Sequence, residues 1–190
     1  CYNVHASLLP KYRGAAPINH AIINGETCTG VTTFLIDKEI DTGMILLSRE
    51  TAISPDETAG SLHDRLMVLG AELAVETARG LFARSLEPVS QKSISPDQLK
   101  TAPKIFPSDT VIDWARPAEQ VLNHIRGLSP YPGAITLMRR GDRELRFKIL
   151  KGGVRKEIMA SPGTISVPDR EHLCVACLAG GIEILSVVPE

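Results

Sequence analysis

Several features that define whole classes of protein are scarce in this chain of 190 residues. Its four cysteines are unevenly spaced in mostly apolar surroundings, which argues against a disulfide framework and favours buried thiols. Cys174 and Cys177 have the spacing of a zinc or redox pair, but no second ligand pair accompanies them, so we expect no metal. No apolar stretch approaches the ~20 residues that span a bilayer. These observations predict a cytoplasmic protein that makes no membrane contact.

The net charge is −1, but the charge is unevenly distributed along the chain. Residues 139–156 carry a charge of +6, and the rest of the chain carries −7. Any polyanion must therefore be bound by a local patch, because the whole chain produces no attractive field. Two interpretations remain open: a solvated face of a strand hairpin, or salt-sensitive contacts to RNA phosphates. For the second, we single out Arg139, Arg140, Arg143 and Lys148.

Apolar periodicity and turn residues divide the chain into a mixed α/β part and a β-rich part. The first part is predicted to hold a strand at its first residues, strands over 29–36 and 44–48, a short helix over 17–24 and a long helix over 56–84. The second part is predicted to hold a helix over 117–127 and strands over 134–138, 146–150, 163–167, 173–178 and 182–187. We therefore expect a domain at 1–86, a Pro- and Ser-rich linker at 87–105, and a small, incomplete barrel at 106–190.

Three polar residues stand where they could carry chemistry. Asn3 and His5 are two positions apart in the first predicted strand, so their side chains share a face and would aim at one substrate atom. Asp41 lies in a turn after an apolar run, where a carboxylate can orient an imidazole and favour its charged form. An asparagine amide can donate to an oxyanion without titrating. The Asn-x-His pattern by itself is common by chance, and a structural histidine at a strand end would look the same.

Two longer segments surround these residues: Ser7-Leu8-Leu9-Pro10-x-x-Arg13-Gly14 and the turn Asp41-Thr42-Gly43. Together with Asn3 and His5 they resemble the active-site motif of the folate-dependent formyltransferases. Further segments, Ala102-Pro103-Lys104-Ile105 and Pro130-Tyr131-Pro132-Gly133-Ala134, look like the linker end and the C-terminal domain of that family. The resemblance covers essentially the whole chain. Glu39 departs from it, since the family often has glycine there.

The resemblance implies an α/β fold, with the C-terminal half of a Rossmann-like formyltransferase domain followed by a small OB-like β-barrel. It implies transfer of a formyl group from 10-formyltetrahydrofolate, as co-substrate, to the amino group of methionyl initiator tRNA. Asn3, His5 and Asp41 then take the catalytic roles. The implied substrate-binding residues are Ser7, Leu8, Leu9, Pro10, Arg13, Gly14, Ile36 and Ile40. We expect the chain to lack the N-terminal half of the protein, to be inactive by itself, and to be monomeric.

Two other functions remain open at this point. A related formyltransferase or hydrolase domain could act on another acceptor, such as an amino sugar or water, with the same Asn, His and Asp. A non-catalytic RNA-binding module, in which the half-domain is vestigial, would keep the basic segment and not need the three polar residues.

Overall fold

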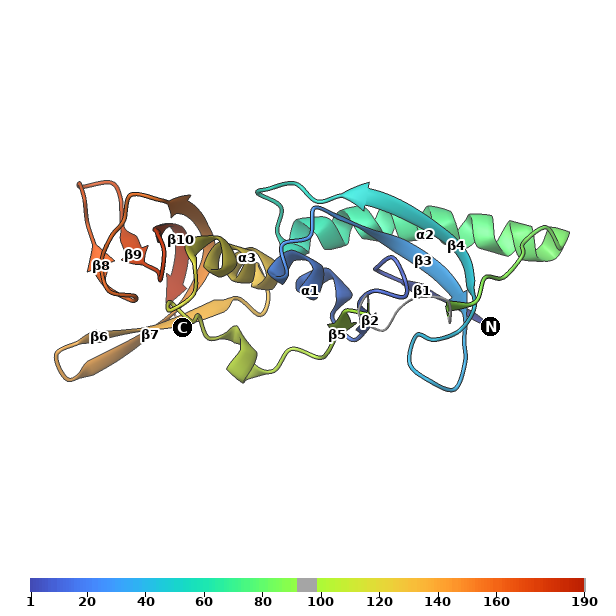
Figure 1. Cartoon of the computed structure of the whole chain (residues 1–190), viewed down its shortest axis with the longest axis horizontal. Coiled ribbons are helices and arrows are strands. Elements are labelled where there is room, and N and C mark those ends of the chain that lie inside the picture. Colours follow the sequence, from blue (N-terminus) through green and yellow to red (C-terminus); the bar gives the residue numbers. More distant parts are fainter. Residues whose placement is uncertain (92–98, 190) are drawn as a thin grey trace. The chain divides into compact units, whose positions relative to one another are not determined.

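The computed structural model describes residues 1–91 and 99–189, with the exception of the Arg140 side chain. The described residues form two compact units (Figure 1). Unit 1 consists of Cys1–Ala21, Glu26–Glu57 and Ser61–Lys104, and unit 2 consists of Ile22–Gly25, Thr58–Gly60 and Ile105–Glu190. Part of the expected linker, residues 92–98, lies outside the described residues.

Unit 1 is built on a three-stranded antiparallel sheet in the order β1-β3-β4. Its strands are β1 (Tyr2–His5), β3 (Cys28–Leu35) and β4 (Ile45–Ala52). β3 is central and almost wholly buried, as its β-branched sequence favours. All three strands were expected from the sequence, although β4 runs four residues further than predicted. β1 lies at the edge of the described sheet, so the strand that carries Asn3 and His5 has one neighbour.

A long helix, α2 (Ala59–Ala83), packs against this sheet (Figure 1). Three leucines of its apolar stripe are buried: Leu62, Leu66 and Leu73. The approach is close at Gly70, where an added Cβ would lie 3.3 Å from a methyl group of Val4. Two buried hydroxyl groups, of Thr33 on β3 and Thr77 on α2, lie 2.8 Å apart and satisfy each other. The helix thus lies over the strand that carries Asn3 and His5.

The connection from β4 to α2 is fixed by a buried carboxylate. Glu57 accepts a hydrogen bond from the backbone N–H of Ser54 and two from the Arg65 guanidinium, at 2.7 and 3.0 Å. Arg65 also donates to Thr51 and to the carbonyl oxygen of Ala52 on β4. Burial acts to raise the pKa of Glu57, but the bonds from Arg65 and Ser54 outweigh it and lower the pKa. This network joins the end of β4 to the first turns of α2.

A short parallel pairing joins β2 (Arg13–Gly14) to β5 (Thr101–Ala102), and the sequence pattern gave no sign of it. A Cβ at Gly14 would lie 2.4 Å from the Ala102 carbonyl oxygen, so only glycine allows this approach. Before the undescribed stretch, Val89 and Ile45 exchange two backbone hydrogen bonds of 2.8 Å. The described residues of the expected linker therefore belong to unit 1, with the exception of Ile105, which is the first residue of the last segment of unit 2.

Unit 2 combines one α-helix with a five-stranded antiparallel sheet in the order β6-β7-β10-β9-β8. Its elements are a short 3-10 helix η3 (Pro107–Thr110), α3 (Ala118–Leu128), and the strands β6 (Ala134–Arg140), β7 (Arg143–Arg155), β8 (Ile165–Ser166), β9 (Cys174–Ala176) and β10 (Gly181–Pro189). The short helix α1 (Pro17–Ile23) begins in unit 1, and its last two residues, Ile22 and Ile23, belong to unit 2. The core lies between α3 and the sheet, where Val121, Ile125 and Leu128 meet Ile149 and Ile182. The unit is β-rich, as expected from its short apolar runs.

Candidate active site

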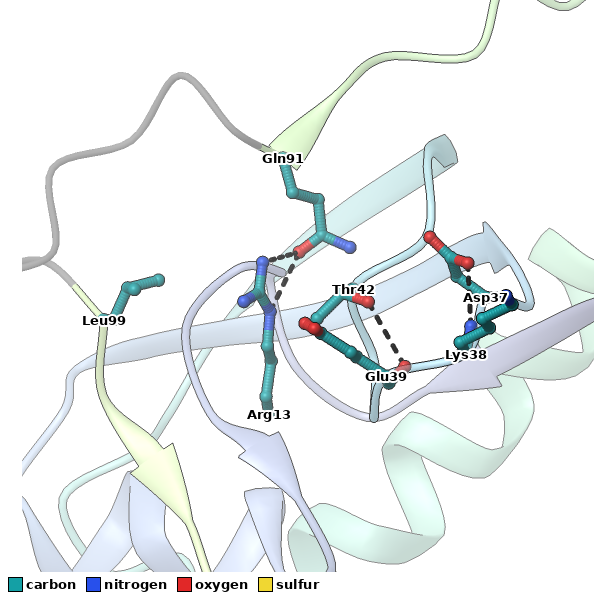
Figure 2. A pocket seen from close by; sticks show the side chains of 7 residues that line it. All are labelled: Arg13, Asp37, Lys38, Glu39, Thr42, Gln91 and Leu99. Carbon is teal, nitrogen blue, oxygen red and sulfur yellow. Dashed lines mark hydrogen bonds between the residues drawn. The ribbon is translucent and has the colours of Figure 1, made fainter.

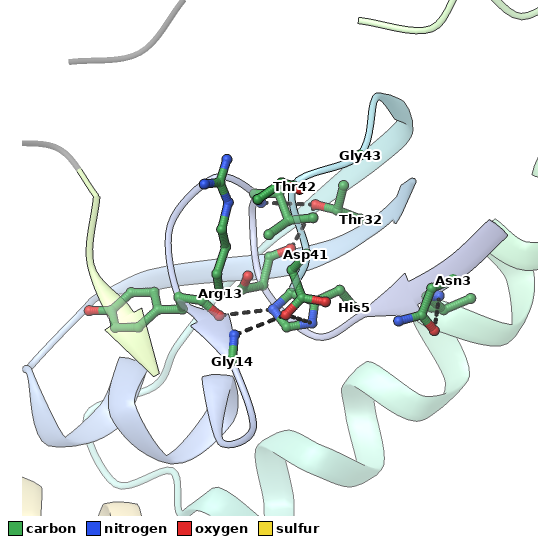
Figure 3. Close-up of polar contacts among 12 residues, drawn as sticks. Asn3, His5, Arg13, Gly14, Thr32, Asp41, Thr42 and Gly43 are labelled. Atoms are coloured by element: carbon green, nitrogen blue, oxygen red, sulfur yellow. Dashed lines mark hydrogen bonds and ion pairs between the residues drawn. The ribbon is translucent and has the colours of Figure 1, made fainter. Parts of the chain in front are cut away.

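The histidine and the aspartate singled out in the sequence lie side by side (Figure 3). Nδ1 of His5 is 3.6 Å from Oδ2 of Asp41, and the two side chains are 8% and 13% exposed. Nε2 of His5 lies 2.8 Å from the carbonyl oxygen of Tyr12, which fixes the orientation of the ring. The structure therefore brings together two of the three residues for which the sequence predicts catalytic roles.

Asp41 is held in a backbone conformation that few residue types accept. Its φ of 56° lies in the left-handed region, which aspartate and asparagine tolerate better than other residues with a side chain. Its carboxylate Oδ2 also accepts the Gly14 N–H at 2.9 Å. Two residues later, a Cβ at Gly43 would lie 1.6 Å from the carbonyl oxygen of Leu35, so the turn closes directly on the end of β3. The turn thus presents the Asp41 carboxylate to His5.

The loop that follows β1 is anchored by a buried threonine. Thr32 of β3 donates to the carbonyl oxygen of Ser7 at 2.7 Å and accepts the Leu9 N–H at 3.1 Å. The Ser7 hydroxyl donates in turn to the carbonyl oxygen of Lys11 at 2.7 Å. These bonds shape the loop so that Tyr12 reaches His5. Thr32 was not predicted as a site residue, because a threonine in a β-branched strand carries no signal of such a role.

Asn3 comes two residues before His5 on β1 and lies apart from the His5–Asp41 pair (Figure 3). Its side chain is exposed, and its Oδ1 accepts the N–H of Val4 at 2.9 Å. That bond leaves both N–H groups of the amide as the donors that Asn3 can offer to a ligand. The catalytic role of Asn3 stays a prediction, which depends on the alternation of side chains between the two faces of β1.

A pocket of about 470 Å³ lies beside the Asp41 turn (Figure 2). It is lined by Arg13, Asp37, Lys38, Glu39, Thr42, Gln91 and Leu99. Arg13, predicted to bind substrate, donates from Nε and Nη2 to Oε1 of Gln91, at 3.2 and 2.8 Å. The walls of the pocket carry charges of both signs. Gln91 was not anticipated, since it stands in a polar segment with no recognisable pattern.

The other predicted substrate-binding residues fall into two groups. Those of the loop after β1 are buried or half-buried: Ser7, Leu8, Leu9, Pro10 and Gly14. The two isoleucines of the loop before Asp41 are instead exposed, Ile36 at 59% and Ile40 at 76%. The first group therefore shapes the site from within, and the second offers apolar surface at its rim.

The basic hairpin of β6 and β7 does not present its predicted residues on one face. In the register, Arg139 pairs with Glu144, Leu137 with Arg146, and Ile135 with Lys148, so these positions share a face. Arg143 is one position from Glu144 and lies on the opposite face. The side chain of Arg140 lies outside the described residues. Arg139 is 81% exposed, and its guanidinium is 3.9 Å from the carboxylate of Glu144.

Within the described part of the chain, no cluster of three or more His, Cys, Asp or Glu side chains is arranged to hold a metal ion. Cys174 and Cys177 are free and buried, as expected for structural thiols, and burial raises the pKa of Cys177 to about 11. Cys1 is instead exposed. No helix among the described residues is long and apolar enough to cross a membrane.

Comparison with known sequences assigns both ends of the chain to one family. Residues 1–78 match the model "Formyl transferase", and residues 104–190 match "Formyl transferase, C-terminal domain". The methionyl-tRNA formyltransferase of Heliobacterium modesticaldum is 48% identical over 98% of this chain and 60% of its own length. That of Flavobacterium johnsoniae is 42% identical over 98% of this chain and 58% of its own length. The chain thus spans a little more than half the length of these relatives.

Solved structures share the fold at lower identity. The N-formyltransferase of Helicobacter canadensis, in complex with folinic acid and dTDP-3-aminofucose, superposes with a TM-score of 0.74 at 22% identity, over 96% of this chain and 65% of its own. HypX of Aquifex aeolicus, in complex with tetrahydrofolic acid, gives a TM-score of 0.72 at 20% identity, over 98% of this chain and 31% of its own. At these identities the likeness concerns the fold, which is one that binds folate derivatives in both neighbours. Since the two family matches together cover 165 of the 190 residues, the chain belongs to the formyl transferase family.

Proposed function

We propose that this chain supplies catalytic residues for the transfer of a formyl group from 10-formyltetrahydrofolate to the amino group of methionyl initiator tRNA. The observation that carries the proposal is the His5–Asp41 pair. It stands in a chain 42% and 48% identical to two methionyl-tRNA formyltransferases. The proposed reaction takes place in the cytoplasm.

The reaction needs a group that stabilises the negative charge developing on the formyl oxygen and a group that takes and returns a proton. The protonated ring of His5 can donate to that oxygen, and the neutral ring can take a proton. The Asp41 carboxylate lies 3.6 Å from Nδ1, and the Tyr12 carbonyl accepts the N–H at Nε2. Nδ1 is then the atom at which His5 exchanges a proton. Asp41 is proposed to hold the ring in place.

Asn3 is proposed to donate from its amide to the same formyl oxygen. Its oxygen is already bonded to Val4, so the side chain has donors to offer and no charge to titrate. One preorganised donor of this kind typically contributes about 10²–10³ in rate. Asn3 and His5 are two positions apart on β1, which places them on one face of the strand.

The pocket beside the Asp41 turn has features that fit part of a folate. Arg13 and Lys38 line it and can pair with the carboxylates, and the exposed side chains of Ile36 and Ile40, each next to a lining residue in the sequence, can contact the faces of the aromatic rings. The co-substrate supplies the formyl group when it is bound. Within the described residues, the protein groups that would then position it are on the loops after β1 and before Asp41.

The acceptor RNA is proposed to contact the face of the β6–β7 hairpin that carries Arg139 and Lys148. These positions share a face with Arg146, and charged contacts of this kind to phosphates are independent of sequence and sensitive to salt. Arg143 lies on the opposite face, so it is not part of this proposed contact.

A chimera tests the proposal, because the chain spans a little more than half the length of its relatives. In it, this chain replaces the matching region of the Flavobacterium johnsoniae relative, which is 42% identical. The purified chimera receives 10-formyltetrahydrofolate together with methionyl initiator tRNA, with a dTDP-linked amino sugar, or with no added acceptor, so that water is the third acceptor. We expect formyl transfer to the tRNA, and a loss of about 100-fold or more in Asp41→Asn, because the charge of a group acting in the transition state is removed.

The acceptors separate the alternatives. Transfer to the amino sugar in place of the tRNA would overturn the proposed acceptor and support a sugar formyltransferase. Release of formate alone would support a hydrolase. A chimera that binds tRNA and folate but gives no product would support the non-catalytic module.

A further inference from the structure

Resting on the proposed function, we propose that Gln91 is a positioning residue for the reaction. It holds the Asp41–Gly43 turn and Arg13 in one arrangement, so that Asp41 faces His5 and Arg13 faces the pocket. Gln91 lies outside the motif that marks the active site in the sequence. Its role follows from the contacts of one buried amide.

Every hydrogen-bonding group of the Gln91 side chain is used. Nε2 donates to the carbonyl oxygens of Asp41, at 3.1 Å, and Gly43, at 2.6 Å. Oε1 accepts from Nε and Nη2 of Arg13. The residue is 5% exposed, so water cannot replace these bonds cheaply if the amide is removed. Two donors and one doubly used acceptor are the full capacity of a glutamine amide.

These bonds close a ring of contacts around the catalytic pair. Gln91 bonds to Arg13 (Figure 2). The next residue, Gly14, donates its N–H to the Asp41 carboxylate (Figure 3), and the Asp41 carbonyl accepts from Gln91. The ring thus fixes both ends of Asp41, its backbone through Gln91 and its side chain through Gly14. A left-handed φ at a residue other than glycine persists where the surroundings impose it, and here the surroundings include Gln91.

Gln91 is itself held in register with the turn. Two residues before it, Val89 exchanges two backbone hydrogen bonds of 2.8 Å with Ile45, the first residue of β4. Ile45 follows Gly43 by two residues. The pairing of Val89 with Ile45 therefore fixes the position of Gln91 relative to the Asp41–Gly43 turn. From this position the amide reaches the carbonyl oxygens of both Asp41 and Gly43.

Chemistry at position 91 explains why an amide is required. Glutamate would still accept from Arg13, but it has no donors, and its charge would face the carbonyl oxygens of Asp41 and Gly43. Methionine has a similar length and no hydrogen-bonding groups of comparable strength, so it would leave three partners unsatisfied. Gln91→Glu and Gln91→Met therefore separate loss of the turn contacts from loss of all contacts.

The first arm of the test measures turnover in the chimera described above. Both variants should lower kcat by about 10–100-fold, since a displacement of about 1 Å at a reacting group can cost ~100-fold. Gln91→Glu, which keeps the Arg13 contact, should leave the KM for the folate within about threefold, whereas Gln91→Met should also raise it. The matched control is Thr77→Val, which removes a buried hydroxyl contact between α2 and β3 and touches neither loop. It should lower the stability and leave kcat unchanged.

The second arm uses the chain itself and does not need activity. The Gly14 amide bonds to the Asp41 carboxylate, so its hydrogen exchange reports whether the carboxylate is in place. Exchange at Gly14 should be at least about tenfold faster in Gln91→Met than in Thr77→Val at equal global stability.

Each outcome decides a different claim. Wild-type kcat and wild-type Gly14 protection in both Gln91 variants would overturn the positioning role. A wild-type chimera without formyl transfer would overturn the proposed function, and the exchange arm would still decide whether Gln91 holds the turn. Equal losses of kcat in Gln91→Met and Thr77→Val would show that Gln91 acts through overall stability and would also overturn the role.

Discussion

Removing the buried carboxylate between β4 and α2 should destabilise unit 1 strongly. Glu57→Ala deletes three hydrogen bonds, two from Arg65 and one from the Ser54 N–H. Buried bonds to a charged group contribute roughly 1.5–3 kcal/mol each, but Arg65 is 46% exposed, so its pair is discounted to about 1–2 kcal/mol in total. The bond from the Ser54 N–H in the turn before α2 adds about 1 kcal/mol. We therefore expect the free energy of unfolding to fall by about 2–3 kcal/mol.

Urea unfolding of the chain, followed by far-UV circular dichroism, measures this loss. The matched control is Glu76→Ala on the same helix, because Glu76 also pairs with an arginine, Arg49, but is 54% exposed. An exposed pair contributes roughly 0–1 kcal/mol, so the control should stay close to the wild type. Equal effects of the two substitutions, or less than about 0.5 kcal/mol for Glu57→Ala, would refute the reasoning that burial decides the energy.

The pH dependence gives a second measurement of the same pair. The pKa of Glu57 is lowered in the folded chain from its ordinary value of 4.5. The unfolded chain therefore binds a proton at a higher pH than the folded chain, and the contribution of Glu57 is complete above pH 4.5. It is lost as the pH falls below that value, through the folded pKa. Glu57→Gln should accordingly lose less stability than the wild type on acidification, and parallel pH curves would contradict the assignment.

Three further predictions concern the site and the hairpin. In the chimera, His5→Ala and Asp41→Ala should each lower kcat by about 100-fold or more, and the double variant should be little worse than either, because the two act as a unit; fully additive losses would contradict the pairing. Arg139→Glu with Lys148→Glu should weaken tRNA binding and reduce its salt slope by about two, and an unchanged slope would leave the hairpin a solvated surface. Gly43→Ala should cost at least about 2 kcal/mol in urea unfolding, because the added Cβ meets a backbone carbonyl; wild-type stability would show that the turn opens freely.

The sequence predicts most of the long elements, because each carries a strong local pattern. The β-branched run around Val31 and the leucine spacing of α2 both report burial that the structure confirms. The pairing of β2 with β5 could not be predicted. Each strand has only two residues, which are too few to show a strand period, and the paired residues are 88 positions apart in the chain. β7 also starts three residues earlier and ends five residues later than expected. The charged residues between Arg143 and Arg146 mask the alternation at its start, and Gly152 and Gly153 weaken the strand pattern at its end.

For the candidate site, the sequence identified residues with marked chemistry and missed residues that act by holding others. His5 and Asp41 were singled out from motif and residue type, and they lie within 3.6 Å. Thr32 and Gln91 were missed because a single buried polar residue is recognisable only once its partners are known. For the basic hairpin, by contrast, the sequence identified the charged residues but not the faces of the strands on which they lie. Counting charge predicted one patch, whereas strand alternation places Arg139 and Arg143 on opposite faces.

The left-handed backbone of Asp41 has a consequence for how selection would act on this position. In a library of all twenty residues at position 41, a screen for folded protein should enrich glycine and asparagine beside aspartate, because these accept a φ of 56°. A screen for formylation should enrich aspartate alone. The two enrichment profiles would differ at two residues, and that difference would separate what the chain needs to fold from what the reaction needs to proceed.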